Sequence, residues 1–151
     1  MDLKKIEEAF IREGYVSIPF SFNGAGHPLI KAMLANNVEA NFLLDTGASI
    51  NLLDYEFAKE LNLHLTLTDG KGGGAGGLIS EIYSLDNISL EIGGQHFKFD
   101  SFFSIDFSTM KEALTATGVT EEIQGILGFG FFQMTKCFID YTGNRIFILN
   151  N

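Results

Sequence analysis

Residues 41–49 read Asn-Phe-Leu-Leu-Asp-Thr-Gly-Ala-Ser, and this stretch decides how the chain is interpreted. An apolar run leads directly into a single carboxylate, Asp45, which is followed by a turn of small residues. Burying an isolated carboxylate is costly, so an aspartate at the end of such a run needs a physical reason. Gly47 can adopt backbone angles and close approaches that side chains forbid, and the Thr46 hydroxyl can anchor the loop. The stretch therefore predicts a carboxylate held rigidly at the floor of a cleft.

Two further stretches follow in a recognisable order. Residues 70–77 read Gly-Lys-Gly-Gly-Gly-Ala-Gly-Gly and lie between two strand-like segments. Ordering so many glycines loses much chain entropy, so we expect the tip to become ordered only when something binds beneath it. Residues 125–128, Gly-Ile-Leu-Gly, precede Phe-Gly-Phe-Phe at 129–132. These stretches predict a glycine-tipped hairpin and a short buried strand that runs into a helix.

Together the three stretches resemble the active-site loop, the flap and the C-terminal apolar segment of pepsin-like and retroviral aspartic proteases. The resemblance covers roughly residues 27–150. The chain looks like a single-domain, bacterial-type member of the retropepsin-like family. It implies a mainly β fold, a retropepsin-like closed barrel with a glycine-rich flap hairpin and two or three short helices. It also implies that the chain is an aspartic endopeptidase acting on peptide or protein substrates.

The resemblance assigns roles residue by residue. Asp45, Thr46 and Gly47 would form the catalytic loop, with Thr46 bonding across a twofold axis and Gly47 presenting backbone groups to the substrate. Ala48 would also contact the substrate, and it makes the loop closer to the retroviral pattern. The flap residues that would fold over an extended peptide are Gly73, Gly74, Ala75, Gly76 and Gly77.

An aspartic protease needs two adjacent carboxylates, and this chain carries one Asp-Thr-Gly. The second Asp45 is therefore expected from a second copy in a homodimer with twofold symmetry. Residues 140–143, Asp-Tyr-Thr-Gly, are only a superficial alternative, because the extra residue spoils the loop and turn residues predict a hairpin there.

Other interpretations of the same residues stay open at this point. Asp, Thr and Gly all favour turns, so Asp45 could be a capped turn at a strand end. The fold could also serve as a non-catalytic peptide-binding or dimerisation module. Residues 72–77 match the G-x-G-x-x-G string of dinucleotide-binding loops, but that motif requires a helix directly afterwards, and residues 78–83 are strand-like. A flexible linker would not need strands on both sides.

Chain length, net charge and the few histidine and cysteine residues limit the domain number and the partners that can be expected. The 151 residues, 46% of them hydrophobic, suit one domain, with an N-terminal helical extension over 1–14 and a protease domain over 15–151. A net charge of −9 opposes phosphate binding, so we expect no nucleic-acid partner. Three scattered histidines and a single cysteine, Cys137, predict no metal, no cofactor and no intrachain disulfide.

We also expect neither a signal peptide nor a membrane-spanning segment from this sequence. The first 12 residues mix charged with apolar residues and do not read as a signal peptide, and no apolar run is long enough to span a membrane. We therefore expect a cytoplasmic protein. We read Cys137 as a core residue because free cysteines are usually buried.

Periodicity and turn residues predict the elements. The extension at residues 2–13 has helical spacing, and it could cap the barrel, shield an edge or take part in dimerisation. Other helices are expected over residues 55–61, with Asp54 as the cap, within the polar insert 106–118, and over 129–135. Pro19 suggests an edge strand, and Gly93-Gly94 a tight hairpin turn. Strands are expected over residues 15–22, 28–36, 38–45, 50–53, 63–67, 78–85, 84–92, 95–105, 123–127, 136–141 and 145–149.

Overall fold

The computed structural model describes residues 2–74, 77–79 and 81–149. The helices are α1 (Leu3–Arg12), α2 (Tyr55–Glu60), α3 (Ser108–Ala116) and α4 (Phe129–Met134), with a 3₁₀ turn at Ala35–Asn37. The strands are β1 (Val16–Pro19), β2 (Ser21–Phe22), β3 (Pro28–Met33), β4 (Glu39–Leu44), β5 (Leu52–Asp54), β6 (Thr66–Leu67), β7 (Gly72–Gly74), β8 (Gly77–Ile79), β9 (Tyr83–Leu85), β10 (Ile88–Ile92), β11 (Gln95–Phe99), β12 (Phe102–Ile105), β13 (Gly125–Leu127), β14 (Phe138–Asp140) and β15 (Arg145–Ile148).

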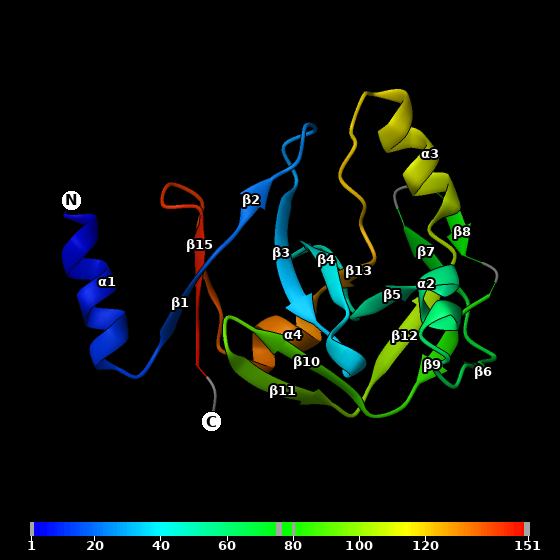
Figure 1. Ribbon diagram of the computed structural model, residues 1–151, viewed down its shortest axis with the longest axis horizontal. Coiled ribbons are helices and arrows are strands. Elements are labelled where there is room, and N and C mark those ends of the chain that lie inside the picture. Colours follow the sequence, from blue (N-terminus) through cyan, green and yellow to red (C-terminus); the bar gives the residue numbers. More distant parts are fainter. Residues whose placement is uncertain (1, 75–76, 80, 150–151) are drawn as a thin grey trace.

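Most of these strands form one large sheet that curls around the core, in the order β11-β10-β3-β4-β13-β5-β12-β9-β6. A second sheet contains β1, β15 and β14, and a third contains β7 and β8 (Figure 1). The mainly β class expected from the sequence is confirmed. Helix α1 lies at one end of the molecule, and α3 lies with the β7–β8 hairpin at the other (Figure 1).

The predicted closure of the barrel is wrong for the described residues. The two end strands of the large sheet, β11 and β6, do not pair with each other. The small sheet instead covers part of the core by side-chain packing, with Ile18, Ile146 and Ile148 buried in the main apolar cluster. Strand β6 has only two residues and pairs with β9, so it offers little length for a further ladder.

Aromatic residues fill the core. The largest fully buried side chains include Phe42, Phe102, Phe131 and Phe147, which come from four different elements. The Cys137 side chain packs against this cluster, and burial raises the pKa of its thiol to about 12. Such a thiol is a poor nucleophile at neutral pH, as the interpretation of Cys137 as a core residue requires.

The N-terminal helix forms where the sequence predicts it. Asp2 caps α1 by accepting a hydrogen bond from the backbone N–H of Lys4 at 3.1 Å. The helix buries no residue completely. It docks on the small sheet through one aromatic side chain, Phe10, whose ring lies 4.5 Å from that of Phe147 between ring centres. Pro19 ends β1, which is an edge strand as expected.

Strands predicted as continuous are broken in several places. Residues 15–22 form β1 and β2, which belong to different sheets, and residues 95–105 form β11 and β12. The stretch 78–85 contributes β8 to the hairpin and β9 to the large sheet. The Gly93-Gly94 turn is confirmed, with φ of 57° and 76°, angles that glycine adopts readily.

Asp54 has a different role from the one expected. It precedes α2 in the cap position, but its side chain makes no capping hydrogen bond there. Its carboxylate is 2% exposed and instead accepts a bond from the Phe107 N–H at 3.1 Å. The Lys111 Nζ lies 2.6 Å from its Oδ2. This pair fixes α3, which lies at the opposite end of the molecule from α1 (Figure 1).

Replacing Lys111 by methionine is expected to lower the free energy of unfolding by about 2–3 kcal/mol, measured by urea denaturation at pH 7. The reason is that a buried carboxylate loses its counter-charge; Lys111 is 42% exposed, so the cost stays below that of a fully buried pair. Lys111→Arg should retain most of the stability. The double variant Asp54→Asn, Lys111→Met should recover part of it, and a stable single methionine variant would contradict this assignment.

Candidate active site

Asp45 follows directly on β4, a strand held on both sides. β3 pairs with β4 in antiparallel orientation, and β13 pairs with it in parallel. Phe42 and Leu44 anchor the strand in the core at 0% and 4% exposure. The Asp45 N–H continues the ladder by donating to the Leu127 carbonyl at 3.0 Å. The apolar run that looks unsuitable for a carboxylate therefore serves to fix the backbone beneath it.

The loop after β4 turns sharply and leaves the carboxylate accessible. The Gly47 N–H donates to the Asp45 Oδ1 at 2.9 Å, and the Ala48 N–H donates to the Asp45 carbonyl at 3.1 Å. Asp45 is half-buried, while Thr46 and Gly47 are exposed. Within the described ranges, the second oxygen, Oδ2, accepts no hydrogen bond. The side chain thus caps its own turn with one oxygen and keeps the other available.

The junction between β13 and α4 is hydrogen-bonded to the loop that follows Asp45 and holds it in place. The Phe129 N–H, at the start of α4, donates to the Ala48 carbonyl at 2.9 Å. Asn51 is 4% exposed, and its Oδ1 accepts from the Gly128 N–H at 3.0 Å and from the Phe131 N–H at 3.3 Å. One amide therefore holds the end of β13 and the start of α4 against the Asp45 loop.

Sequence reasoning did not single out Asn51. The residue stands between Ile50 and Leu52, inside the strand expected over residues 50–53. Only the fold shows that two backbone donors 77 and 80 residues away converge on it. An asparagine within an apolar strand, three residues before the cap position Asp54, was a weak signal, because buried polar side chains need partners.

Replacing Asn51 by alanine should lower the free energy of unfolding by about 2–4 kcal/mol, measured by urea denaturation. Two buried N–H groups would lose their acceptor, and each costs about 1–3 kcal/mol when left unsatisfied. Asn51→Asp keeps the accepting oxygen and should lose less. Asn41→Ala offers a comparison at an asparagine that lies near the surface and bonds the Glu122 carbonyl. Equal stability of Asn51→Ala and wild type would show that the hydrogen bonds of Asn51 do not stabilise the fold.

The glycine stretch forms part of a hairpin. Gly72, Gly73 and Gly74 pair with Ile79, Leu78 and Gly77 in antiparallel register. Ala75 and Gly76, two of the residues predicted to contact substrate, lie outside the described residues. The prediction that the tip becomes ordered on binding concerns these residues and stays a prediction. Among the described residues, no hydrogen bond joins this hairpin to residues 45–48.

Leu78 is 88% exposed in this hairpin. At its base, the Thr68 N–H and hydroxyl both donate to the Ile82 carbonyl, at 2.9 and 2.8 Å. Ile79 and Ile82 join an apolar cluster that also contains Ala48 and Ile50 from the Asp45 loop region. The hairpin base and the carboxylate loop are therefore parts of one packed unit.

Asp140, the alternative candidate for a second catalytic aspartate, has a structural role. The Gly143 N–H donates to the Asp140 Oδ1 at 2.8 Å, and the Arg145 Nε lies 3.0 Å from its Oδ2. These contacts, the Gly143 bond foremost, hold the pKa of Asp140 below its usual value. Both oxygens are occupied, so Asp140 is not a second catalytic carboxylate. Across the described parts of the chain, no cluster of three or more His, Cys, Asp or Glu could hold a metal, and no helix is long and apolar enough to cross a bilayer.

Comparison with known proteins agrees with this geometry. The family model described as "Aspartyl protease" matches residues 30–131, which include the Asp45 loop, the hairpin and the start of α4. The chain belongs to this aspartyl protease family. No relative was found among curated protein sequences.

Two solved structures share the fold. A retropepsin-like aspartic protease from Rickettsia conorii is 24% identical, with a TM-score of 0.53, over 89% of this chain and 88% of that one. EIAV protease in complex with the inhibitor HBY-793 is 23% identical, with a TM-score of 0.52, over 75% of this chain and 91% of that one. The retropepsin-like resemblance predicted from the sequence is therefore confirmed at the level of family and fold.

Proposed function

We propose that this protein is an aspartic endopeptidase that works as a homodimer, with one water activated between two Asp45 carboxylates. The observation that carries the proposal is the half-buried Asp45 at the end of β4, held by Gly47 with one oxygen left open. One copy supplies only half of the required pair. The family match and the shared fold support hydrolysis of peptide bonds.

The chemistry follows from bringing two carboxylates together. Like charges about 3 Å apart cannot both ionise, so the pair holds one proton between them. The ionised member takes a proton from the water, which attacks the peptide carbonyl, while the protonated member donates to the carbonyl oxygen. No covalent intermediate forms with the protein. The pair titrates as a unit, and neither copy has its own catalytic pKa.

The remaining residues position the substrate. The backbone of Gly47 and Ala48 would bond an extended peptide at the floor of the cleft, and Thr46 would lock the two loops together. Gly73, Gly74 and Gly77 would close over the peptide from the hairpin. Glycines suit this task because a peptide backbone can approach them without meeting a side chain.

The proposal is tested by incubating the purified protein with a library of denatured proteins and identifying new peptide ends by mass spectrometry. A shared site predicts that the specific activity rises with protein concentration through the range in which the dimer forms. Peptide binding without any turnover, across about pH 4 to 7 where carboxylates titrate, would instead identify a non-catalytic peptide-binding module.

A further inference from the structure

Helix α1 is fixed to the small sheet by Glu7 and Phe10. The Glu7 Oε2 lies 2.6 Å from the Arg145 Nη1, and Phe10 stacks on Phe147 of β15. Phe10 also contacts Phe138, with 4.7 Å between ring centres. These contacts tie the helix to the β1–β15–β14 sheet and set its direction. The helix is thus presented as a rigid element rather than as a loose tail.

The neighbouring flank of α1 borders an open cavity of about 400 Å³. The lining is Lys5, Ile6, Ala9, Phe10, Glu13, Tyr15 and Phe138. Its walls are almost entirely apolar, and Phe138 is 51% exposed to solvent. Within the part of the chain that the structure describes, neither Lys5 nor Glu13 forms an ion pair through its side chain. An apolar groove with two unpaired opposite charges at its ends is suited to a partner with the same features.

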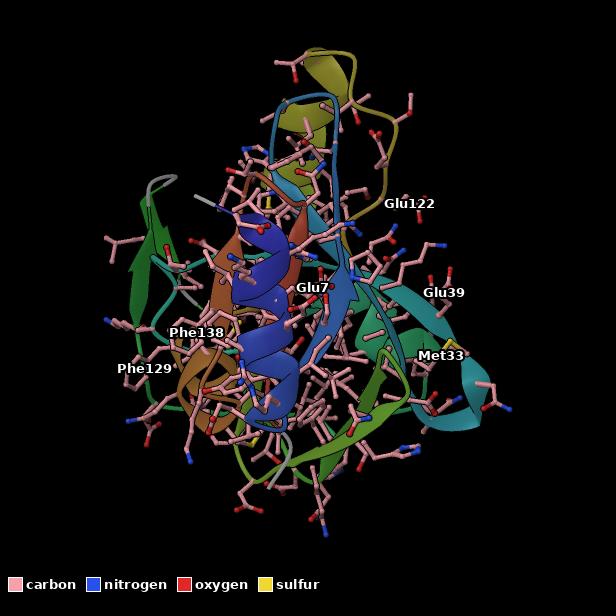
Figure 2. All side chains as sticks on the ribbon, turned by 90° about the vertical axis from the view of Figure 1, so that its left-hand side faces the viewer. Glu7, Met33, Glu39, Glu122, Phe129 and Phe138 are labelled. Carbon is pink, nitrogen blue, oxygen red and sulfur yellow. The ribbon has the colours of Figure 1, made fainter. Side chains whose placement is uncertain are left out.

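Phe138, which lines the groove, lies on the same side of the molecule as Phe129 at the start of α4. In Figure 2 the Phe129 and Phe138 side chains both lie on the side from which the green β7–β8 hairpin projects. Phe129 is 57% exposed, and its N–H donates to Ala48 in the Asp45 loop. Glu39 and Glu122 lie on the opposite side (Figure 2). Two exposed aromatic residues, Phe129 next to the Asp45 loop and Phe138 next to α1, therefore lie on the same side of the molecule.

The order of residues in α1 is self-complementary. Lys5 and Glu13 stand at equal distances along the chain on either side of Ala9, and all three lie on the groove flank. If two copies of α1 cross antiparallel on a twofold axis at Ala9, each Lys5 faces the other copy's Glu13. Ala9 is exposed and small, so the two helix backbones can approach closely at the crossing.

We propose that the α1 groove is an interface for a second copy of this chain, formed by antiparallel pairing of the two α1 helices across Ala9. The inference rests on the homodimer of the proposed function and extends it. The two Asp45 loops meet at one part of the face, and α1 adds a helix pair at the other. The extension at the N-terminus is then a dimerisation element rather than a cap or an edge shield.

The test is the dimer dissociation constant, measured by sedimentation equilibrium with the full chain. Lys5→Glu and Glu13→Lys each replace two opposite-charge contacts by two like-charge contacts, because each change occurs twice in a symmetric dimer. Each single variant should therefore weaken the dimer about tenfold. The double variant Lys5→Glu, Glu13→Lys restores opposite charges and should restore wild-type affinity. Salt should reduce these differences.

Controls separate this pairing from general charge effects. Lys4→Glu and Glu8→Lys change the net charge by the same amounts on exposed positions that do not line the groove, and they should leave the dissociation constant unchanged. Ala9→Glu places two carboxylates at the crossing and should weaken the dimer in an intact fold. Wild-type protein that is monomeric at high concentration, or single variants that dimerise as well as wild type, would overturn the proposal.

The failure of this inference is distinguishable from failure of the proposed function. The measurement needs no substrate and no turnover. A protein that cleaves peptides as a dimer but ignores the charges of Lys5 and Glu13 keeps its proposed activity and loses the α1 interface. A double variant that stays as weak as the single variants would also reject the Lys5–Glu13 pairing.

Discussion

Replacing Asp45 by asparagine is expected to lower the rate of peptide cleavage by about 10⁴-fold or more, because the pair loses both its shared proton and its base. The change should leave the fold intact. Asparagine has nearly the same shape, and its side-chain oxygen can still accept the bond from the Gly47 N–H, which now measures 2.9 Å to Oδ1. The substitution is therefore expected to lower the cleavage rate while the free energy of unfolding stays close to that of wild type. Both quantities can be measured on one preparation.

Mixing the two proteins tests whether the site is shared. If copies exchange freely, a wild-type protein diluted with a ninefold excess of Asp45→Asn pairs with itself only about one time in ten. Activity per wild-type copy should fall by about the same factor. A site contained within one copy would keep its full activity in the mixture. That result would reject the homodimer while leaving the peptidase assignment in place.

Asp86→Asn serves as the matched control. Asp86 is exposed and lies in the turn between β9 and β10, so the substitution changes the same charge without touching the loop. Its cleavage rate should equal that of wild type, both alone and in mixtures. Equal cleavage by Asp45→Asn and Asp86→Asn would remove Asp45 from the mechanism.

The sequence predicted those features that depend on neighbouring residues. Apolar residues before Asp45 and glycine after it are local signals, and the strand and turn form where those signals lie. The same holds for α1, which the helical spacing of residues 2–13 predicts. The glycine turn at Gly93-Gly94 is likewise set by backbone preference alone.

Features that depend on distant residues could not be predicted in this way. Asp54 reads as a helix cap from its neighbours, yet it pairs with Lys111, which lies 57 positions later in the chain. Asn51 falls within a strand expected from its neighbours, yet its side chain accepts hydrogen bonds from the end of β13 and from α4. Residues 95–105 are expected as one strand, yet β11 pairs with β10 while β12 pairs with β5 and β9, and these partners lie elsewhere in the sequence.

Replacing Gly128 by alanine is expected to lower the free energy of unfolding by about 2–4 kcal/mol. A Cβ at this position would lie 2.5 Å from the Ile50 carbonyl oxygen, 2.6 Å from the Ala48 carbonyl oxygen and 3.0 Å from the Ala48 Cβ. Two of these atoms belong to the backbone and cannot rotate away. The backbone angle at Gly128 is not the obstacle, since its φ of −113° suits any residue.

The same change should also disturb the site, because the clash falls on the loop that carries Asp45. The Ala48 carbonyl accepts the Phe129 N–H, so moving Ala48 breaks the contact between the loop and α4. Cleavage by the folded fraction of Gly128→Ala should therefore fall well below that of wild type under conditions where both are folded.

Gly74→Ala provides the comparison that separates close packing from the loss of a glycine. A Cβ at Gly74 meets nothing within 4 Å, so its free energy of unfolding should stay within about 0.5 kcal/mol of wild type in urea denaturation. Chain entropy cannot explain a loss in either variant, because replacing glycine by alanine reduces the entropy of the unfolded chain and so favours the folded state. Similar losses in both variants would therefore reject the close approach of Gly128 to the Asp45 loop as the specific cause. A large loss confined to Gly128→Ala would show that the two loops are packed as one unit. The carboxylate would then be held by a segment more than 80 residues further along the chain, as the Asp45 N–H bond to the Leu127 carbonyl requires.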